Sequence, residues 1–157
     1  MESLKITAHV GTTIPLLAGA VGKAFLCHES PGRVRELIGE KGLPRYSPKS
    51  ITDIDDYLAE LDRVRSMGYA IDDEEYLSGI RAVAVALDNR RGLPMAVWVV
   101  GIASNMEMAR LKEVADLTTV AVKKLRLQLD GNQDRDMKAA TGAENPGNLE
   151  EQVLNCR

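Results

Sequence analysis

The chain has 157 residues, of which 45% are hydrophobic but only 4% aromatic, and its formal net charge at pH 7 is −3. This length suffices for one domain with its own core, and the scarcity of aromatic residues predicts a core of Ala, Val, Leu and Ile. The basic residues are spread along the chain rather than gathered on one stripe, which excludes a strongly basic surface for tight DNA binding.

The N-terminal segment is expected to form a strand followed by a helix. Apolar and polar residues alternate over Leu4–Val10, which predicts a half-buried strand ending at Gly11. Proline is favoured at the first position of a helix, so the next helix is expected to open at Pro15. Its small residues between Ala18 and Gly22 allow close approach of another backbone or of a ligand.

Two further helices are predicted from their capping residues. Ser30 followed by Pro31 predicts a short helix that reaches about Ile38. Residues 42–49 contain two prolines and predict a loop. Residues 52–68 have apolar residues at helical spacing, with Thr52 or Asp53 as the cap at one end and a glycine at the other.

The middle of the chain predicts strands. Residues 69–71 are expected to form a short strand, and residues 80–87 and 95–100 two longer ones, since they are rich in valine and isoleucine. Residues 88–92 have turn chemistry, so the two longer strands are predicted to form an antiparallel hairpin.

The longest helix is expected after the hairpin. Ser104 and Glu107 form a capping-box pattern at its start. Its apolar stripe packs on the sheet or forms a dimer seam, and we favour the sheet; the stripe consists of Met108, Leu111, Ala115, Thr118, Val122, Leu125 and Leu129. After Leu129 the residues offer little to bury, so residues 1–129 are expected to form the domain and 130–157 a disordered tail. The order of elements predicts an α+β fold with an antiparallel sheet.

Several features limit the cellular location and the classes of function that the sequence supports. No apolar run approaches the roughly 18 residues that a membrane span needs, and the N-terminus lacks the plan of a signal peptide. Cys27 and Cys156 are the only cysteines, too few for a disulfide framework. No phosphate loop, dinucleotide fingerprint, zinc-protease motif or nucleophile elbow occurs. We therefore expect a cytoplasmic protein without membrane contact, metal, cofactor or catalytic residues.

Two groups of residues raise the question of a metal or catalytic site. The run from Asp72 to Glu75 has oxygen ligands, but only alternate side chains of an extended segment share a face, so a solvated turn is favoured. Cys27 and His28 are adjacent, yet neighbours on a helix point about 100° apart. A structural, buried Cys27 is therefore favoured over a thiolate–imidazole pair. Lys23 lacks the rest of a phosphate loop and is interpreted as a structural or surface lysine.

Three segments resemble the effector-binding domain of IclR-type bacterial transcription regulators. They are Gly68-Tyr-Ala-Ile-Asp-Asp-Glu-Glu75, the Ile14–Leu26 segment with its Gly-Lys-Ala, and residues 50–68. The resemblance runs from about Leu4 to Leu129. It implies a GAF-like or profilin-like antiparallel sheet flanked by helices, and a homodimer or homotetramer. It also implies DNA binding only through a helix-turn-helix domain that this chain lacks, and family domains usually have a helix and two strands before the segment that matches Leu4–Val10.

The same resemblance implies an effector pocket with Asp72 in its wall. By position, the backbone amides of Ala20 and Val21 are expected to meet a bound carboxylate, which agrees with the preference of helix N-termini for anions. Ala82 matches a further pocket position, and Ile6 and Ile14 are expected as apolar walls.

The chain departs from the family pattern in ways that affect the expected effector. Leu17 replaces a frequent histidine, and Trp98 and Val100 stand where serines are common. Loss of hydroxyl donors makes a very small polar acid less suitable and favours a larger, apolar or aromatic carboxylate. Trp98 is equally compatible with a plain core position.

The sequence thus predicts a ligand-sensing and oligomerisation domain whose partner is a small organic acid effector. Two alternatives stay open. One is an enzyme that acts on a small acid with Asp72 as base, although no partner for the base is recognisable. The other is a degenerate oligomerisation domain in which Trp98 and Val100 fill the pocket.

Overall fold

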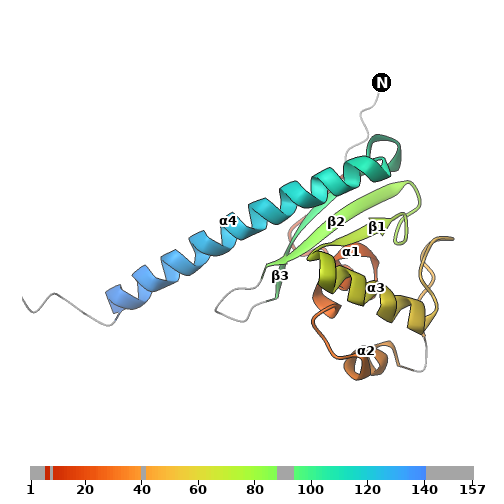
Figure 1. Cartoon of the computed structure of the whole chain (residues 1–157), viewed down its shortest axis with the longest axis horizontal. Coiled ribbons are helices and arrows are strands. Elements are labelled where there is room, and N and C mark those ends of the chain that lie inside the picture. The colour runs from red at the N-terminus through yellow and green to blue at the C-terminus, as the bar shows by residue number, and fades with distance from the viewer. Residues whose placement is uncertain (1–5, 8, 40–41, 88–93, 141–157) are drawn as a thin grey trace, which may run out of the picture.

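The computed structural model of the chain describes residues 6–7, 9–39, 42–87 and 94–140, with side chains described through Gly131. Its elements in chain order are α1 (Gly19–Leu26), α2 (Pro31–Ile38), α3 (Ile54–Met67), β1 (Ala70–Asp73), β2 (Ile80–Leu87), β3 (Met95–Ile102), the 3-10 turn η1 (Ala103–Asn105) and α4 (Met108–Ala140). Figure 1 shows α4 across one face of the sheet, with α1 and then α2 and α3 on the other side. The expected α+β architecture with a long C-terminal helix is confirmed.

The sheet has three antiparallel strands in the order β1-β2-β3. Successive side chains of a strand point to opposite faces, and β2 is covered on both. Ala82 and Ala84 belong to the core cluster beneath α1, whereas Val83 and Val85 pack beneath α4. The central strand therefore carries small residues toward the short helix and larger ones toward the long helix.

The caps of α2 and α3 are those that the sequence predicts. The Ser30 hydroxyl accepts the Arg33 N–H at 3.2 Å, and α2 ends before Gly39. Asp53 Oδ1 accepts two N–H groups of the first turn of α3 at 2.8 and 3.0 Å. Gly68 ends α3 with a φ of 79°, a left-handed conformation that glycine adopts without steric cost.

The expected N-terminal strand and the expected start of α1 are both wrong. The described residues of the first segment, 6–7 and 9–10, form no strand and are exposed. Helix α1 begins at Gly19 rather than at Pro15, because Gly19 has a φ of 57° and a right-handed helix cannot run through that conformation. Pro15 instead accepts the Ala18 N–H in a turn that precedes the helix.

Helix α4 also begins later than expected. Ser104 lies in η1, so the capping box with Glu107 does not form, and the first turn bond runs from the Leu111 N–H to the Glu107 carbonyl at 2.9 Å. The apolar stripe of α4 packs on the sheet where the helix crosses the sheet, because the buried residues of the stripe are Leu111, Ala115, Thr118 and Val122. The members beyond Val122 are exposed.

The boundaries of other expected elements differ by small amounts. Strand β1 is shifted to 70–73, and β3 reaches Ile102. Helix α4 continues through residues 130–140, where disorder was expected, because each residue added to a formed helix gains a backbone hydrogen bond. The predicted turn at 88–92 and residues 141–157 lie outside the described residues. Within the described part of the chain, none of the helices combines the length and apolar character that a membrane span requires.

Candidate functional site

A cavity of about 640 Å³ lies beside the sheet on the side of α1, opposite α4. Its walls come from the N-terminal segment, the turn after β1, the start of β2 and the middle of β3. The described residues that line it are Ile6, Thr7, His9, Thr12, Thr13, Ile14, Asp72, Tyr76, Leu77, Ile80, Trp98 and Val100. Cavities of this size accommodate small organic molecules.

The structure brings together most of the residues that the sequence placed in a pocket. Ile6, Ile14, Asp72, Trp98 and Val100 all line the cavity. Trp98 lines the cavity and also packs against the core cluster beneath α1, and its contact with an effector stays a prediction. The cavity remains beside it, so Trp98 and Val100 narrow the pocket without filling it.

The other predicted residues lie next to the cavity rather than in its described lining. Ala82 is fully buried and pairs with Asp72 on β1 and with Val100 on β3. Ala20 is buried among the core residues, and Val21 packs against them from the first turn of α1. Neither residue is among the described residues of the cavity lining, and the role of their amides in binding stays a prediction.

Asp72 is the buried acid of the cavity wall, with only 3% of its surface exposed. Its Oδ1 accepts the N–H of Glu75 at 2.6 Å and that of Tyr76 at 3.4 Å. Its Oδ2 lies against Gly19 at the start of α1, where a Cβ on the glycine would overlap it. Burial raises the pKa of Asp72, and the two N–H bonds oppose the rise. Asp72 therefore closes the turn after β1 and presents a poorly hydrated carboxyl at the cavity.

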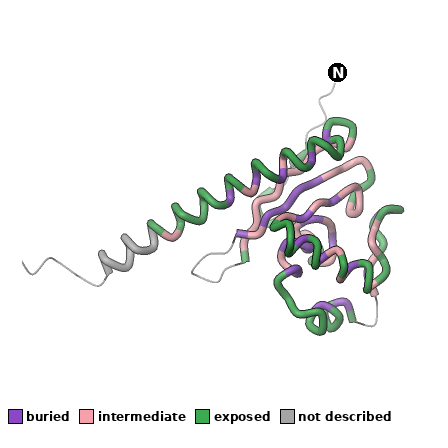
Figure 2. Tube along the Cα trace, in the orientation of Figure 1, coloured by how far each residue is buried: buried purple, intermediate pink, exposed green. Residues whose placement is uncertain are grey.

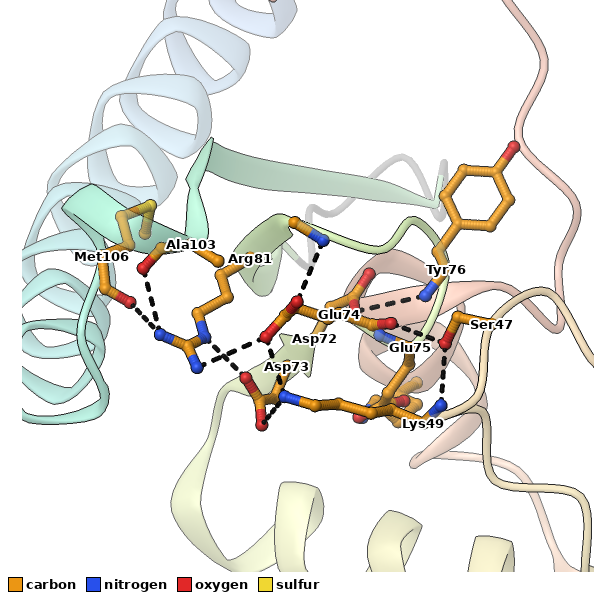
Figure 3. A network of polar contacts seen from close by, with 12 residues as sticks. Ser47, Lys49, Asp72, Asp73, Glu74, Glu75, Tyr76, Arg81, Ala103 and Met106 are labelled. Atoms are coloured by element: carbon orange, nitrogen blue, oxygen red, sulfur yellow. Dashed lines mark hydrogen bonds and ion pairs between the residues drawn. The ribbon is translucent and has the colours of Figure 1, made fainter.

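The acidic run does not gather its carboxylates around one point. Figure 3 shows Asp73 and Glu74 turned toward Lys49 and Arg81, away from Asp72. Arg81 donates to Asp73 at 2.5 Å, and Lys49 donates to Glu74 at 2.7 Å. Among the described residues no set of three or more His, Cys, Asp or Glu side chains is placed to hold a metal ion.

The pKa values of Asp73 and Glu74 are lowered, whereas that of Asp72 is raised. Hydrogen bonds from Lys49 and from the Gly79 amide lower the pKa of Glu74. Burial acts to raise the pKa of Asp73, but hydrogen bonds from Arg81 and Lys49 outweigh it and the net pKa is lowered. Glu74 has a φ of 64°, and its backbone carbonyl accepts the Ser47 hydroxyl at 2.6 Å. The turn is thus fixed by charged partners on its outer side.

Sequence reasoning missed a buried ion cluster behind this turn. The Lys23 side chain is 0% exposed, and its Nζ lies 2.7 Å from Glu75 and 3.3 Å from Glu60. The glutamates are themselves largely covered, at 14% and 18% exposure for Glu60 and Glu75. Burial raises the pKa of Glu75, while Lys23 acts to lower it. The only sign of this cluster in the sequence was a lysine in a helix whose other residues are apolar or small. Of the two interpretations of Lys23, structural or surface residue, the structural one is confirmed.

The polar groups around the cavity limit what it can bind. No lysine or arginine is among the described residues of its lining. The side chains of the lining that can donate a hydrogen bond are those of Thr7, His9, Thr12, Thr13, Tyr76 and Trp98, while Asp72 can accept one. A ligand with an acid group at one end, an apolar body and a donor facing Asp72 would use all of these surfaces.

Cys27 and His28 do not form a pair. Cys27 is buried, with its Sγ 3.4 Å from the Ala24 carbonyl oxygen, whereas His28 is exposed. Both line a separate cavity of about 180 Å³ between the ends of α1 and α3.

Comparison with known proteins agrees with the resemblance. A family model described as the bacterial transcriptional regulator IclR C-terminal domain matches residues 1–127. The chain is 29% identical over 139 residues to the HTH-type transcriptional regulator BhcR of Paracoccus denitrificans, covering 88% of this chain and 50% of BhcR. It is 30% identical over 129 residues to the transcriptional repressor IclR of Escherichia coli, covering 82% of this chain and 47% of that repressor.

A solved structure extends the comparison. The crystal structure of a double mutant of the inducer-binding domain of PobR from Acinetobacter, in complex with 3-hydroxybenzoic acid, has a TM-score of 0.69 and 28% identity, over 80% of this chain and 74% of that one. The chain spans about half the length of the curated relatives it matches. These relatives are transcriptional regulators, not enzymes.

Proposed function

This chain belongs to the IclR family of bacterial transcriptional regulators as its C-terminal domain, and from that premise we propose that it senses a small carboxylic acid bound in the cavity beside Asp72. The observation that carries the proposal is the buried Asp72 carboxyl in the wall of a cavity of about 640 Å³. A hydrogen bond from a ligand stabilises a buried carboxyl that water hydrates poorly. A donor on the ligand is therefore expected to face Asp72.

The lining favours an apolar acid that carries a hydroxyl group. Isoleucine, leucine, valine and tryptophan are half of the described lining residues, and Thr12, Thr13 and His9 offer donors to a carboxylate. The relative PobR was crystallised with 3-hydroxybenzoic acid, which has this combination of groups. We accordingly propose a hydroxylated aromatic or similarly apolar acid as the effector class.

The proposed action is sensing without turnover. A ligand shifts a conformational equilibrium only by its difference in affinity for the two states, so no bond needs to break. In an intact regulator this difference would act on an attached helix-turn-helix domain that binds DNA in the cytoplasm. We also propose that the domain self-associates as a dimer or tetramer, which gives the effector an arrangement of subunits to change.

A thermal-shift screen tests the proposal. The full chain is heated with apolar and aromatic carboxylic acids, each with and without a hydroxyl group, and ligand consumption is followed in the same samples. At a hundred times its dissociation constant, a ligand adds about 2.7 kcal/mol, which corresponds to roughly 5–10 °C for a domain of this size. Asp72→Asn keeps an acceptor for the two backbone N–H groups but removes the charge, and Asp116→Asn on the exposed surface of α4 is the matched control.

We expect a selective shift with a hydroxylated acid, no consumption, and loss of most of the shift in Asp72→Asn only. An equal shift in both variants would exclude Asp72 from the site. Steady consumption of the acid would replace the sensor with an enzyme, and no shift with any acid would favour the degenerate oligomerisation domain.

A further inference from the structure

An ion pair lies behind the part of the cavity wall that Asp72 forms. Lys23 belongs to α1 and Glu75 to the turn after β1, and neither is among the described residues of the cavity lining. The Lys23 Nζ lies 2.7 and 2.9 Å from the two carboxylate oxygens of Glu75. The backbone N–H of Glu75 donates to Asp72 Oδ1 at 2.6 Å. A pair of charges in the core is thereby linked to the carboxyl in the cavity wall.

The two charges of the pair act on Asp72 in opposite directions. Burial raises the pKa of Asp72, and the fully buried Lys23 ammonium acts to lower it. Burial also raises the pKa of Glu75; Lys23 acts to lower it, and the charge of Asp72 adds to the rise. Because the repulsion between two carboxylates is mutual, an ionised Glu75 favours the protonated form of Asp72.

The other charged groups of the turn lie on its outer side. Asp73 is paired with Arg81, and Glu74 is paired with Lys49. Behind burial, the charge of Asp73 is a smaller contribution that raises the pKa of Asp72, but Arg81 and Lys49 compensate this charge. The cation that acts on Asp72 from the core side of the turn is Lys23.

The elements packed around this region add few further charges. Helix α3 contributes the buried Tyr57 and Glu60, whose carboxylate lies 3.3 Å from the Lys23 ammonium. Among the described residues of the cavity lining, His9 is a titratable group on the N-terminal segment, and β3 contributes only uncharged side chains. Helix α4 covers the opposite face of the sheet, and Figure 2 shows β2 buried between α4 and the helices of the other side.

We propose that Lys23 and Glu75 are positioning residues of the effector site, which set the charge of the Asp72 carboxyl and thereby the pH range in which an effector hydroxyl binds to it. A hydroxyl group donates a stronger hydrogen bond to a carboxylate than to a neutral carboxyl group. The contribution of the hydroxyl to affinity therefore follows the ionisation of Asp72, which Lys23 favours and Glu75 opposes. This inference rests on the function proposed above and names two residues outside the cavity that control it.

Two acids that differ by one hydroxyl group isolate this contact. The dissociation constants of benzoate and 3-hydroxybenzoate for the full chain are measured by titration calorimetry from about pH 4, near the ordinary pKa of an aspartate, to about pH 8.5. Ionisation of the carboxyl group is common to the two acids, and so is any contribution of His9. The ratio of the two dissociation constants therefore reports the contact of the hydroxyl group with Asp72.

One variant removes each charge of the pair. Lys23→Met removes the cation, whereas Glu75→Gln removes the carboxylate and keeps an oxygen that accepts from Lys23. Lys112→Met and Glu113→Gln, on the exposed surface of α4, are the matched controls. A carbon-13 NMR titration of the Asp72 carboxyl in the same proteins gives the order of its pKa values without a ligand. If Lys23→Met does not fold, Glu75→Gln decides the test by itself.

We expect the affinity ratio of the wild type to rise about fivefold in favour of the hydroxylated acid as Asp72 ionises. The rise should move to higher pH in Lys23→Met and to lower pH in Glu75→Gln, and the controls should match the wild type. The pKa of Asp72 from NMR should follow the same order. A merely structural role of the pair would instead weaken the binding of both acids in both variants and leave the pH of the rise unchanged.

The outcomes separate this inference from the proposed function. If the acids bind but their ratio does not change with pH, or moves in the same direction in both variants, the inference is overturned and the sensor stands. If these two acids do not bind, the NMR order alone confirms or overturns the control of Asp72 by the pair. Absence of binding by every acid of the thermal-shift screen overturns the proposed function separately.

Discussion

The buried ion cluster around Lys23 gives a sharp test of the energetics. Lys23→Met keeps the volume of the side chain but removes the ammonium that bridges Glu75 at 2.7 Å and Glu60 at 3.3 Å. Breaking a buried pair by removing one partner costs about 3–5 kcal/mol, because the other charge stays buried. Both glutamates are slightly exposed, so we expect the free energy of unfolding to fall by about 3 kcal/mol at neutral pH, which lowers Tm by roughly 6–12 °C.

The loss should depend on pH in a defined direction. Burial already raises the pKa of Glu75 above its ordinary value of 4.5, and Lys23 opposes the rise, so the variant raises it further. A carboxyl whose folded-state pKa is raised stabilises the fold while protonated and loses that stability as pH rises through the raised pKa. The penalty of Lys23→Met should therefore be small at acid pH, where Glu75 is protonated in both proteins, and grow toward neutral pH.

Urea unfolding followed by the fluorescence of Trp98, the single tryptophan, measures these differences. The runs are made at about pH 4, below the ordinary pKa of glutamate, and at about pH 8. Lys112→Met on the exposed surface of α4 serves as control and should change stability by less than about 0.5 kcal/mol. Adding Glu75→Gln to Lys23→Met should recover part of the loss. A penalty below about 1 kcal/mol, or one that does not change with pH, would show that water solvates the cluster and refute the reasoning.

Three further perturbations follow from local geometry. Gly22→Ala places a Cβ onto the Leu16 carbonyl oxygen, a backbone atom that moves only with its turn, so a loss of about 1–3 kcal/mol is expected in thermal unfolding; an unchanged Tm would contradict the close approach. Asp53→Ala removes the acceptor for two N–H groups of α3 and should cost about 1 kcal/mol in urea unfolding, with Asp53→Ser recovering most of it. Burial raises the pKa of Asp72, so ionisation of Asp72 destabilises the fold as pH rises. The free energy of unfolding of Asp72→Asn should match that of the wild type at acid pH and equal or exceed it at higher pH. A variant that is less stable than the wild type only above neutral pH would contradict this direction.

Features governed by interactions between near neighbours in the chain were accessible from the sequence. The caps at Ser30 and Asp53, the glycine end of α3 at Gly68 and the extent of β2 depend on residues within a few positions of one another. The order of the predicted elements indicated the α+β fold class, whereas the family and the place of Asp72 at the cavity came from a resemblance that covers most of the chain. The same local rules were wrong at Pro15 and Ser104, where a left-handed glycine and a 3-10 turn compete with the expected helix starts.

Contacts between distant residues decided the rest. Alternation over Leu4–Val10 predicts a strand but does not show which neighbour would pair with it, and the described residues there, 6–7 and 9–10, are exposed and form no strand. The sequence around Lys23 is compatible with a surface lysine or a structural one. In the fold, α3 and the turn after β1 bring Glu60 and Glu75 to Lys23, and these two carboxylates offset the cost of burying its charge. The sequence alone determined the family and the place of most helices and strands. The tertiary structure decided which charges are buried and where the cavity lies, because each of these depends on packing between elements that are far apart in the chain.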